Sequence, residues 1–339
     1  MKNLRTAKIE DPTKLNWWGR LKRWYHHGDR VWQTLIVSMS ILVLVLMLAI
    51  GLLLWQNSFH ARTQFGWDFI SPIGNANWDP VNNLFRAWPL IYGTLITSLF
   101  ALIIAIPLSL GVAVFLSELC PQWLRVPLGL LVELLAAIPS VVYGLWGIFV
   151  FLPMVVFPVG EFLGATLGHV PLLSVFFNGS IPNSGASRLA AAMILTIMIT
   201  PTISAVSRDV FLAIPSSQRE ASLALGATQY ETISRVLIPY GLSGILGAVI
   251  LGLGRALGET MAVTMVIGNS IEGTFSLLRP GYTMSSIIAN EFAEAVSQLH
   301  SEALIEVAFI LFVMTLLLNV IARLLVWRVA RRTPQEARA

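Results

Sequence analysis

Charged side chains are scarce in this chain. Asp, Glu, Lys and Arg together make up 12% of its 339 residues, whereas hydrophobic residues make up 56%. A soluble protein carries roughly twice that share of charge. With a mean hydropathy of +0.74, this shortage favours a protein that crosses a membrane several times. We interpret the net charge of +4 as a sign of membrane orientation and expect no binding to nucleic acid.

Cysteine and metal-ligating histidine are also scarce. The chain has one cysteine, Cys120, so it cannot form an intrachain disulfide or a thiolate metal cluster. Its five histidines do not have the spacing of a closed metal site, which needs three or four converging ligands. We therefore expect this chain to bind no metal and no cofactor of its own.

Lysine is absent beyond residue 22. The four lysines, at positions 2, 8, 14 and 22, all precede the first apolar segment. A Walker A loop needs Gly-Lys-Ser/Thr, because its lysine reaches the β- and γ-phosphates of ATP. The chain therefore cannot hydrolyse ATP by that route. It also lacks His-Glu-x-x-His and Gly-x-Ser-x-Gly motifs, so we expect no enzyme and no catalytic residue.

Apolar segments of about the length of a bilayer span occur six times. They predict an all-α, polytopic membrane protein with transmembrane helices at residues 32–55, 90–116, 126–152, 189–206, 241–268 and 303–326. The predicted organisation is a basic N-terminal segment (1–31), a first helix (32–55), an external loop (56–89), a five-helix core (90–327) and a tail (328–339).

Basic residues predict the orientation of these helices. The segments 1–31, 117–125, 207–240 and 327–339 hold sixteen Lys and Arg, and the loops on the opposite side hold four. This bias places both termini in the cytoplasm. The apolar segment 154–177 resembles a seventh span, but a crossing there would move 207–240 outside. We therefore expect 154–177 to form a short helix that lies at the outer interface or dips into it.

The polar segment 207–240 predicts two short helices on the cytoplasmic surface. Ser216 or Ser217 can cap the first, Gly226 is a natural end for it, and Pro239 ends the second. Two such helices would make a compact knob, and an ordinary loop is an equally good interpretation from this pattern alone.

The segment resembles the EAA motif of ABC-importer permeases. The matching residues are EAS at 220–222, a glycine at 226, and VLIP at 236–239; the segment departs from the motif by Ser for the second Ala, Val for Ile and Ile for Leu. The resemblance implies that the knob docks on a separate ATPase subunit, which binds the ATP and magnesium. The implied coupling residues are Glu220, Ala221, Ser222, Gly226 and Pro239.

Three further segments of the sequence make the resemblance more specific. Residues 136–150, 199–215 and 254–269 are similar to the permeases of phosphate-specific ABC importers. The resemblance implies a type I importer permease core in the bacterial inner membrane. It also implies four kinds of partner, namely phosphate, a second permease, two copies of an ATPase subunit and a periplasmic phosphate-binding protein.

The predicted fifth span contains two charges, Arg255 and Glu259. Charged residues at bilayer depth are costly and usually functional. Residues four apart on a helix are neighbours, so the sequence predicts an ion pair that phosphate can open. A purely structural ion pair is the alternative. Thr260 and Ser140 are weaker candidates for the same substrate path.

Other functions remain open at this point. The chain could carry another oxyanion, such as sulfate, molybdate or phosphonate, or could be the second type of permease in the phosphate importer. A transporter driven by protons or sodium ions would need no cytoplasmic knob and no ATPase.

Overall fold

The computed structural model describes residues 28–72, 78–271 and 274–330. The chain divides into two units, Met1–Leu53 and Leu54–Ala339, which we describe separately. The described part of the first unit is helix α2 (Gly28–Asn57), which continues into the second unit. Its apolar side chains are exposed along nearly the whole length, and Val31–Asn57 is long and apolar enough to cross a membrane. This helix agrees with the predicted first span.

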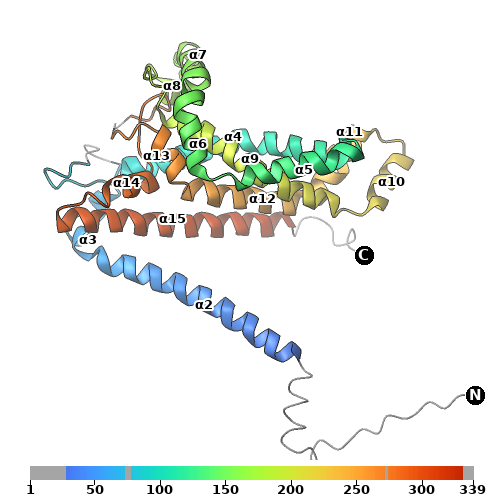
Figure 1. Ribbon diagram of the computed structural model, residues 1–339, viewed down its shortest axis with the longest axis horizontal. Coiled ribbons are helices and arrows are strands. Elements are labelled where there is room, and N and C mark those ends of the chain that lie inside the picture. Colours follow the sequence, from blue (N-terminus) through green and yellow to red (C-terminus); the bar gives the residue numbers. More distant parts are fainter. Residues whose placement is uncertain (1–27, 73–77, 272–273, 331–339) are drawn as a thin grey trace, which may run out of the picture. The chain divides into compact units, whose positions relative to one another are not determined.

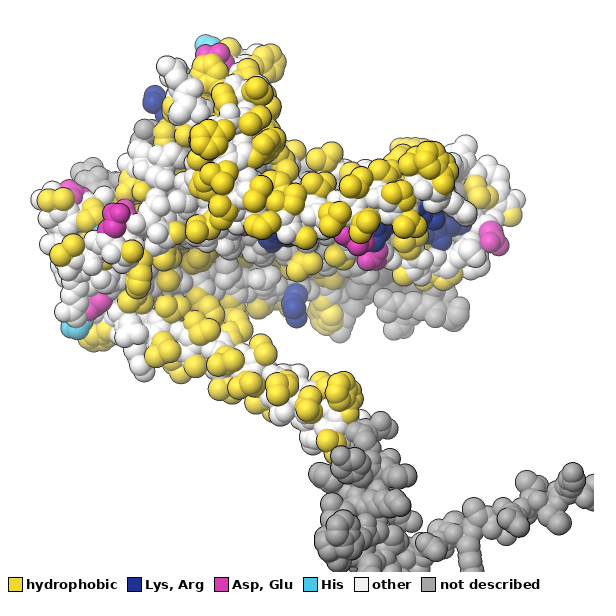
Figure 2. Space-filling model, in the orientation of Figure 1, with side chains coloured by type: hydrophobic (Ala, Val, Ile, Leu, Met, Phe, Trp, Pro, Cys, Tyr) yellow, Lys and Arg dark blue, Asp and Glu magenta, His cyan; other side chains and the backbone are white. Residues whose placement is uncertain are grey.

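Four long helices run along one another in the second unit (Figure 1). They are α4 (Trp88–Val114), α9 (Arg188–Leu212), α12 (Ile238–Gly258) and α15 (Gln298–Ala330). Helix α9 packs against both α4 and α12, so its apolar side chains, including Ile194, Met198 and Ile203, are fully buried. Hydrophobic side chains cover much of the face shown in Figure 2, and the few charged ones lie mostly towards the ends, with isolated basic side chains between. That distribution suits a bundle within a bilayer.

The predicted third span, 126–152, is wrong as a single helix. Helix α5 (Gln122–Ala137) ends before Pro139, and α6 (Ser140–Trp146) begins after it. Proline lacks an N–H and disfavours helical geometry in the preceding residue, and Ile138 is extended with a ψ of 130°. The structure instead offers Ser140–Leu167 as the long apolar helix.

The predicted interfacial segment, 154–177, is also wrong as an independent short helix. Its first part continues from α6 through a π-helical stretch, η4 (Gly147–Val156), into α7 (Phe157–Leu167). Only the four-residue α8 (Ser174–Phe177) is separate. In Figure 1, α5 lies along the bundle, whereas α6 and α7 turn crosswise to it. The break at Pro139 therefore changes the direction of the chain.

The predicted external loop, 56–89, is folded for much of its length. It contains α3 (Phe59–Phe65) and a 3-10 turn, η2 (Gly66–Phe69), and helix α4 already begins at Trp88. The rings of Phe69, Trp78 and Phe85 are buried against α14 (Met284–Glu291) and α15. Burial of these large aromatic side chains attaches the segment to the core that it shares with α14 and α15. Nearly all of 1–31 and of the tail lies outside the described residues.

Gly93 allows α4 to pack tightly against the chain before α14. A Cβ at position 93 would overlap the carbonyl oxygen of Tyr282. We therefore expect Gly93→Ala to lower stability by about 1–3 kcal/mol, because a backbone atom must move to make room. Gly111 is the matched control on the same helix, since a Cβ there meets nothing within 4 Å.

Thermal unfolding of the purified protein in detergent measures this difference. Gly111→Ala is expected to leave the midpoint unchanged or raise it, since alanine favours a helix over glycine by about 1 kcal/mol. Equal midpoints for the two variants would show that the α4–Tyr282 contact is loose.

Candidate functional site

The site is built around Arg255, near the C-terminal end of α12. Its guanidinium donates one hydrogen bond from Nη1 to Thr202 Oγ1 (3.0 Å) and one from Nη2 to the Ala136 carbonyl oxygen (3.3 Å). Thr202 lies on α9, and Ala136 lies at the C-terminal end of α5. Carbonyl oxygens at a helix C-terminus attract a cation. These neutral partners hold the guanidinium in place without cancelling its charge.

The predicted ion pair between Arg255 and Glu259 is wrong. Helix α12 ends at Gly258, and Glu259 is extended, with a ψ of 126°. The next helix, α13, spans Met261–Val266. The two side chains therefore do not share a helical face, and none of the ion pairs among the described residues joins them.

Glu259 makes local contacts instead. Its Oε1 accepts a hydrogen bond from the Ala262 backbone N–H (3.2 Å), so the carboxylate caps the first turn of α13. Its backbone carbonyl oxygen accepts a bond from Ser285 Oγ (2.8 Å). Gly258 is a poor helix former, and the side chains of Glu259 and Thr260 both bond to nearby backbone groups at this break.

Thr260 and Ser140 lie at the two helix breaks near Arg255. The Thr260 hydroxyl donates to the Gly258 carbonyl oxygen (3.3 Å), and Ser140 is the first residue of α6, four residues after Ala136. Neither is among the hydrogen-bond partners of Arg255. Their part in a substrate path therefore stays a prediction.

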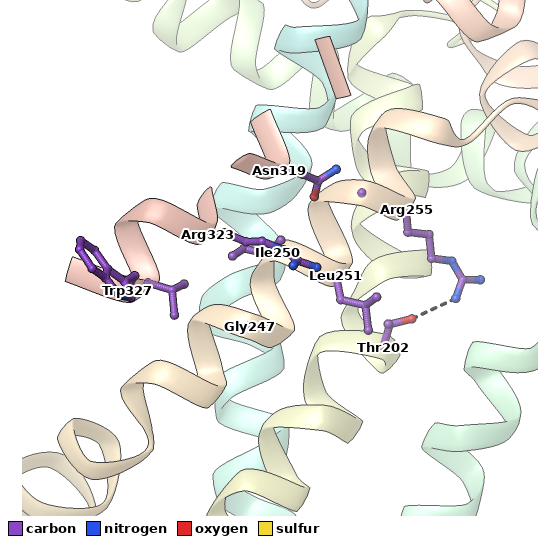
Figure 3. Close-up of a pocket in the computed structure, with 10 residues that line it drawn as sticks. Thr202, Gly247, Ile250, Leu251, Arg255, Asn319, Arg323 and Trp327 are labelled. Carbon is purple, nitrogen blue, oxygen red and sulfur yellow. Dashed lines mark hydrogen bonds between the residues drawn. The ribbon is translucent and has the colours of Figure 1, made fainter. Parts of the chain in front are cut away.

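A cavity of about 790 Å³ opens beside Arg255 (Figure 3). Helices α12 and α15 supply most of its walls. Its polar lining residues are Arg255, Thr202, Asn319 and Arg323, and its apolar ones include Leu251 and Trp327. Sequence reasoning missed Thr202, Asn319 and Arg323. An arginine within the last apolar segment was a usable signal for Arg323, whereas nothing in the sequence places Thr202 next to Arg255.

The predicted knob exists as two short helices at one end of the bundle (Figure 1). Helix α10 spans Ser216–Ala224, and Gly226 follows it with a φ of +87°, which confirms the predicted end of the first helix. The predicted cap is wrong, because Pro215 holds the N-cap position and makes no side-chain cap bond. Helix α11 (Gln229–Thr232) begins with a capping box between Thr228 and Glu231.

Pro239 does not end the second helix, contrary to the prediction. Helix α11 continues through a π-helical turn, η5 (Ile233–Leu237), directly into α12. Pro239 is the second residue of α12. Its missing N–H and its ring would disturb a regular α-helical turn only in the residues just before it, which here form η5. The wider π-helical turn of η5 leaves room for the proline ring, so the chain stays helical without a break from the knob to Arg255.

Arg219 fixes α10 to the rest of the bundle. It forms a bidentate ion pair with Glu118, with Nη2 at 2.8 Å from Oε1 and Nε at 3.1 Å from Oε2. It also donates to the carbonyl oxygens of Phe211 and Ile214, each at 2.7 Å. Glu118 lies in η3 (Phe115–Leu119), which continues α4. Sequence reasoning missed this pair, although both residues stand in polar breaks between apolar segments.

The other predicted knob residues fall into two groups. Ser222 Oγ lies 2.9 Å from Thr232 Oγ1, a hydrogen bond that joins α10 to α11. Glu220 and Ala221 are exposed. Close by, the apolar side chains of Leu223, Leu225 and Tyr230 are 51%, 90% and 78% exposed. Large apolar side chains exposed beside a charged one are typical of a docking surface for another protein.

Comparison with known proteins agrees with this architecture. A family model described as "Binding-protein-dependent transport system inner membrane component" matches residues 105–333. The "Phosphate transport system permease protein PstC" of Mesorhizobium japonicum is 45% identical over 305 residues, which cover 90% of this chain and 92% of that protein. The protein of the same name from Xylella fastidiosa is 41% identical over 306 residues, with the same coverage.

A solved structure supports the fold. A chain of "Crystal structure of a bacterial ABC transporter involved in the import of the acidic polysaccharide alginate" superimposes with a TM-score of 0.56, at 17% identity, over 92% of this chain and 100% of that chain. This protein is therefore an all-α, multi-pass membrane permease that belongs to the family of inner membrane components of binding-protein-dependent transport systems and, within that family, to the PstC proteins.

Proposed function

We propose that this chain is a permease subunit that moves inorganic phosphate across the bacterial inner membrane into the cytoplasm. The observation that carries the proposal is its 45% identity, over nearly its whole length, to a protein named as a phosphate transport system permease. Arg255 supports it chemically, because an arginine stays charged in an apolar setting and offers a planar fork of donors that suits phosphate.

The transporter is proposed to be an assembly of several chains. The partners are a second, PstA-like permease, two copies of a PstB-like ATPase and a periplasmic PstS-like phosphate-binding protein. ATP and magnesium are then bound by the ATPase, and both termini of this chain lie in the cytoplasm. The exposed surface of α10 and α11, with Leu225 and Tyr230, is where we expect the ATPase to dock.

Phosphate contact is assigned to the Arg255 guanidinium. In the present structure two of its N–H groups bond to Thr202 and to the Ala136 carbonyl oxygen. These neutral acceptors leave the positive charge available to an anion, and an anion can replace them without leaving a carboxylate unpaired. A single guanidinium also keeps the affinity moderate, which transport needs because a very tight site would trap its cargo.

The contacts of α9 suggest how closure of the ATPase reaches Arg255. Arg219 of the knob binds the carbonyl oxygen of Phe211 near the C-terminal end of α9, and Thr202 lies on the same helix. At 1.5 Å per residue, these positions are roughly 14 Å apart along the helix axis. Movement of α10 would therefore be passed through a rigid helix to the hydroxyl that holds the guanidinium. The resulting alternating access would be a rigid-body motion.

Competition between anions tests the substrate. Uptake of labelled phosphate is measured in cells that depend on this transporter, with sulfate, molybdate or a phosphonate added in excess. We expect only unlabelled phosphate to reduce uptake strongly. Strong inhibition by one of the other anions would assign the transporter to that anion instead.

Glu259 does not line the cavity beside Arg255, but we propose that phosphate meets it at another point of the path and that it contributes to the choice of phosphate over sulfate. Phosphate near neutral pH still carries a proton and can donate a hydrogen bond to a carboxylate, whereas sulfate carries none. We expect Glu259→Gln to keep the cap on α13, because the amide oxygen still accepts the bond from Ala262. The same variant should weaken the preference for phosphate over sulfate by roughly tenfold, the equivalent of one hydrogen bond to a charged group. An unchanged preference in the competition assay would leave Glu259 with the capping role alone.

A further inference from the structure

A second guanidinium lines the cavity beside Arg255. Arg323 belongs to α15, whereas Arg255 belongs to α12. Both are described residues, and no Asp or Glu lines this cavity or forms an ion pair with either arginine among the described residues. Arg255 is half-buried and Arg323 is exposed. Like charges that face one cavity repel each other, and a bound anion would relieve that repulsion.

The two arginines occupy different levels of the cavity. Helices α12 and α15 run antiparallel (Figure 1): α12 begins at the knob end of the bundle, and α15 ends there. Arg323 points towards Ile250 and Leu251, while Arg255 is turned towards Thr202 (Figure 3). Ile250 precedes Arg255 by five residues, which is roughly 8 Å nearer the knob along the axis of α12. Arg323 therefore lies nearer the knob than Arg255 does, on the side that we propose faces the cytoplasm.

The cavity wall between the two levels leaves room for a small anion. Gly247 and Gly254 of α12 both line the cavity, and a Cβ at either position would meet nothing within 4 Å. The Asn319 side chain, one turn before Arg323, donates its amide to the Thr315 carbonyl oxygen (2.9 Å). Its carbonyl oxygen can then accept a hydrogen bond from the remaining proton of a phosphate ion.

We propose that Arg323 is a second phosphate-binding side chain, which receives the anion from Arg255 on the inward half of the path. The proposal rests on the function proposed above. Two guanidiniums at separate levels hold the anion in turn, so each step exchanges one charge-assisted contact for another. A phosphate cage made by both at once would bind more tightly and release more slowly.

Uptake kinetics in proteoliposomes containing the complete transporter test this role. Arg323→Gln is expected to lower the maximal rate by about tenfold, the equivalent of one charge-assisted hydrogen bond, and to change KM by less than about twofold, because loading from outside precedes this step. Arg323→Lys keeps the charge but loses the planar fork, and should recover about a third of the wild-type rate. Arg328→Gln is the matched control, since Arg328, like Arg323, is exposed on α15 but does not line the cavity.

The outcomes separate this inference from the proposed function. A wild-type rate in Arg323→Gln overturns the inference, and if Arg255→Gln is inactive in the same assay, the proposed function stands. Wild-type rates in both variants would contradict the proposed phosphate path past Arg255 as well as the role of Arg323. If Arg323→Gln fails to assemble with the ATPase, the maximal uptake rate of Arg323→Lys is used instead. A wild-type rate in that variant would contradict the inference.

Phospholipid headgroups carry the same phosphate chemistry and are tested separately. The assay is repeated in vesicles of phosphatidylcholine alone and in vesicles that also contain anionic phosphatidylglycerol. Binding of the transported anion predicts the same defect for Arg323→Gln in both membranes. A defect that occurs only with the anionic lipid would assign Arg323 to the membrane surface and overturn the transport role.

Discussion

Replacing Arg255 with glutamine is expected to lower phosphate uptake by roughly 100-fold, which corresponds to the loss of two charge-assisted hydrogen bonds. Glutamine can still donate to Thr202 or to the Ala136 carbonyl oxygen, which are the two partners of Arg255. The local fold should therefore survive while the charge that attracts the anion is lost. Uptake of labelled phosphate is measured in membranes, and assembly is measured by co-purification of the ATPase.

Two further variants show which property of Arg255 matters. Arg255→Lys keeps the charge without the planar fork and should retain a small part of the uptake. Thr202→Val keeps Arg255 but removes one of its positioning bonds, and should slow uptake by about fivefold, the equivalent of one neutral hydrogen bond. If the glutamine and lysine variants both import at the original rate, Arg255 is a packing residue and the proposed path is wrong.

Breaking the Arg219–Glu118 pair is expected to uncouple the knob from the bundle. Both side chains are mostly buried, with exposed fractions of 22% and 11%. Removing one partner of such a pair leaves the other uncompensated, which costs about 3 kcal/mol. Arg219→Ala also removes the bonds to the Phe211 and Ile214 carbonyl oxygens. We therefore expect uptake to fall by at least tenfold even where the ATPase remains bound.

The ratio of phosphate transported to ATP hydrolysed measures this uncoupling. A loss of stability alone would lower both rates together, whereas uncoupling lowers only transport. Glu133→Ala is the matched control, because Glu133 also pairs with an arginine, Arg208 (2.8 Å), but is 53% exposed. Arg208 is only 14% exposed, but it keeps a second partner, Asp209 (3.0 Å), when Glu133 is removed, so this variant should behave like the wild type. An unchanged ratio in Arg219→Ala would contradict the role of Arg219 in transmission.

The sequence predicted the elements whose signals are local. Apolar length was sufficient to predict the number of candidate membrane helices, six among the described residues, although the third lies at Ser140–Leu167 and not at 126–152. A glycine after a short amphipathic segment was sufficient to predict the end of α10 at Gly226. The family followed from a motif in the same segment together with three further blocks. Each of these signals depends on residues that are close in the chain, so it does not require knowledge of the packing.

The errors arose where several local interactions compete. Pro139 breaks a helix, but Pro239 does not, because a π-helical turn relieves its clash in one continuous helix. Apolar composition alone did not separate these cases. The same limit explains Glu259, which was expected on the face of Arg255 and instead caps α13 beyond the break at Gly258.

Contacts between distant parts of the chain were not predictable from one sequence. Thr202 and Ala136 reach Arg255 from 53 and 119 residues away, and Glu118 reaches Arg219 from 101 residues away. Both lie in blocks that resemble the permease family, at 136–150 and 199–215, but neither carries a charge that would mark it as a partner of Arg255. Their positions depend on how α5, α9 and α12 pack, which residue spacing does not specify.

Reconstitution tests the central claim most directly. Proteoliposomes are prepared with this chain, the second permease, the ATPase and the phosphate-binding protein, and labelled phosphate is measured inside the compartment that corresponds to the cytoplasm. Our account predicts accumulation against the gradient only when ATP is supplied on the side of the ATPase, and none with an ATPase variant that lacks its Walker lysine. Uphill accumulation without ATP, by the two permeases alone, would contradict it.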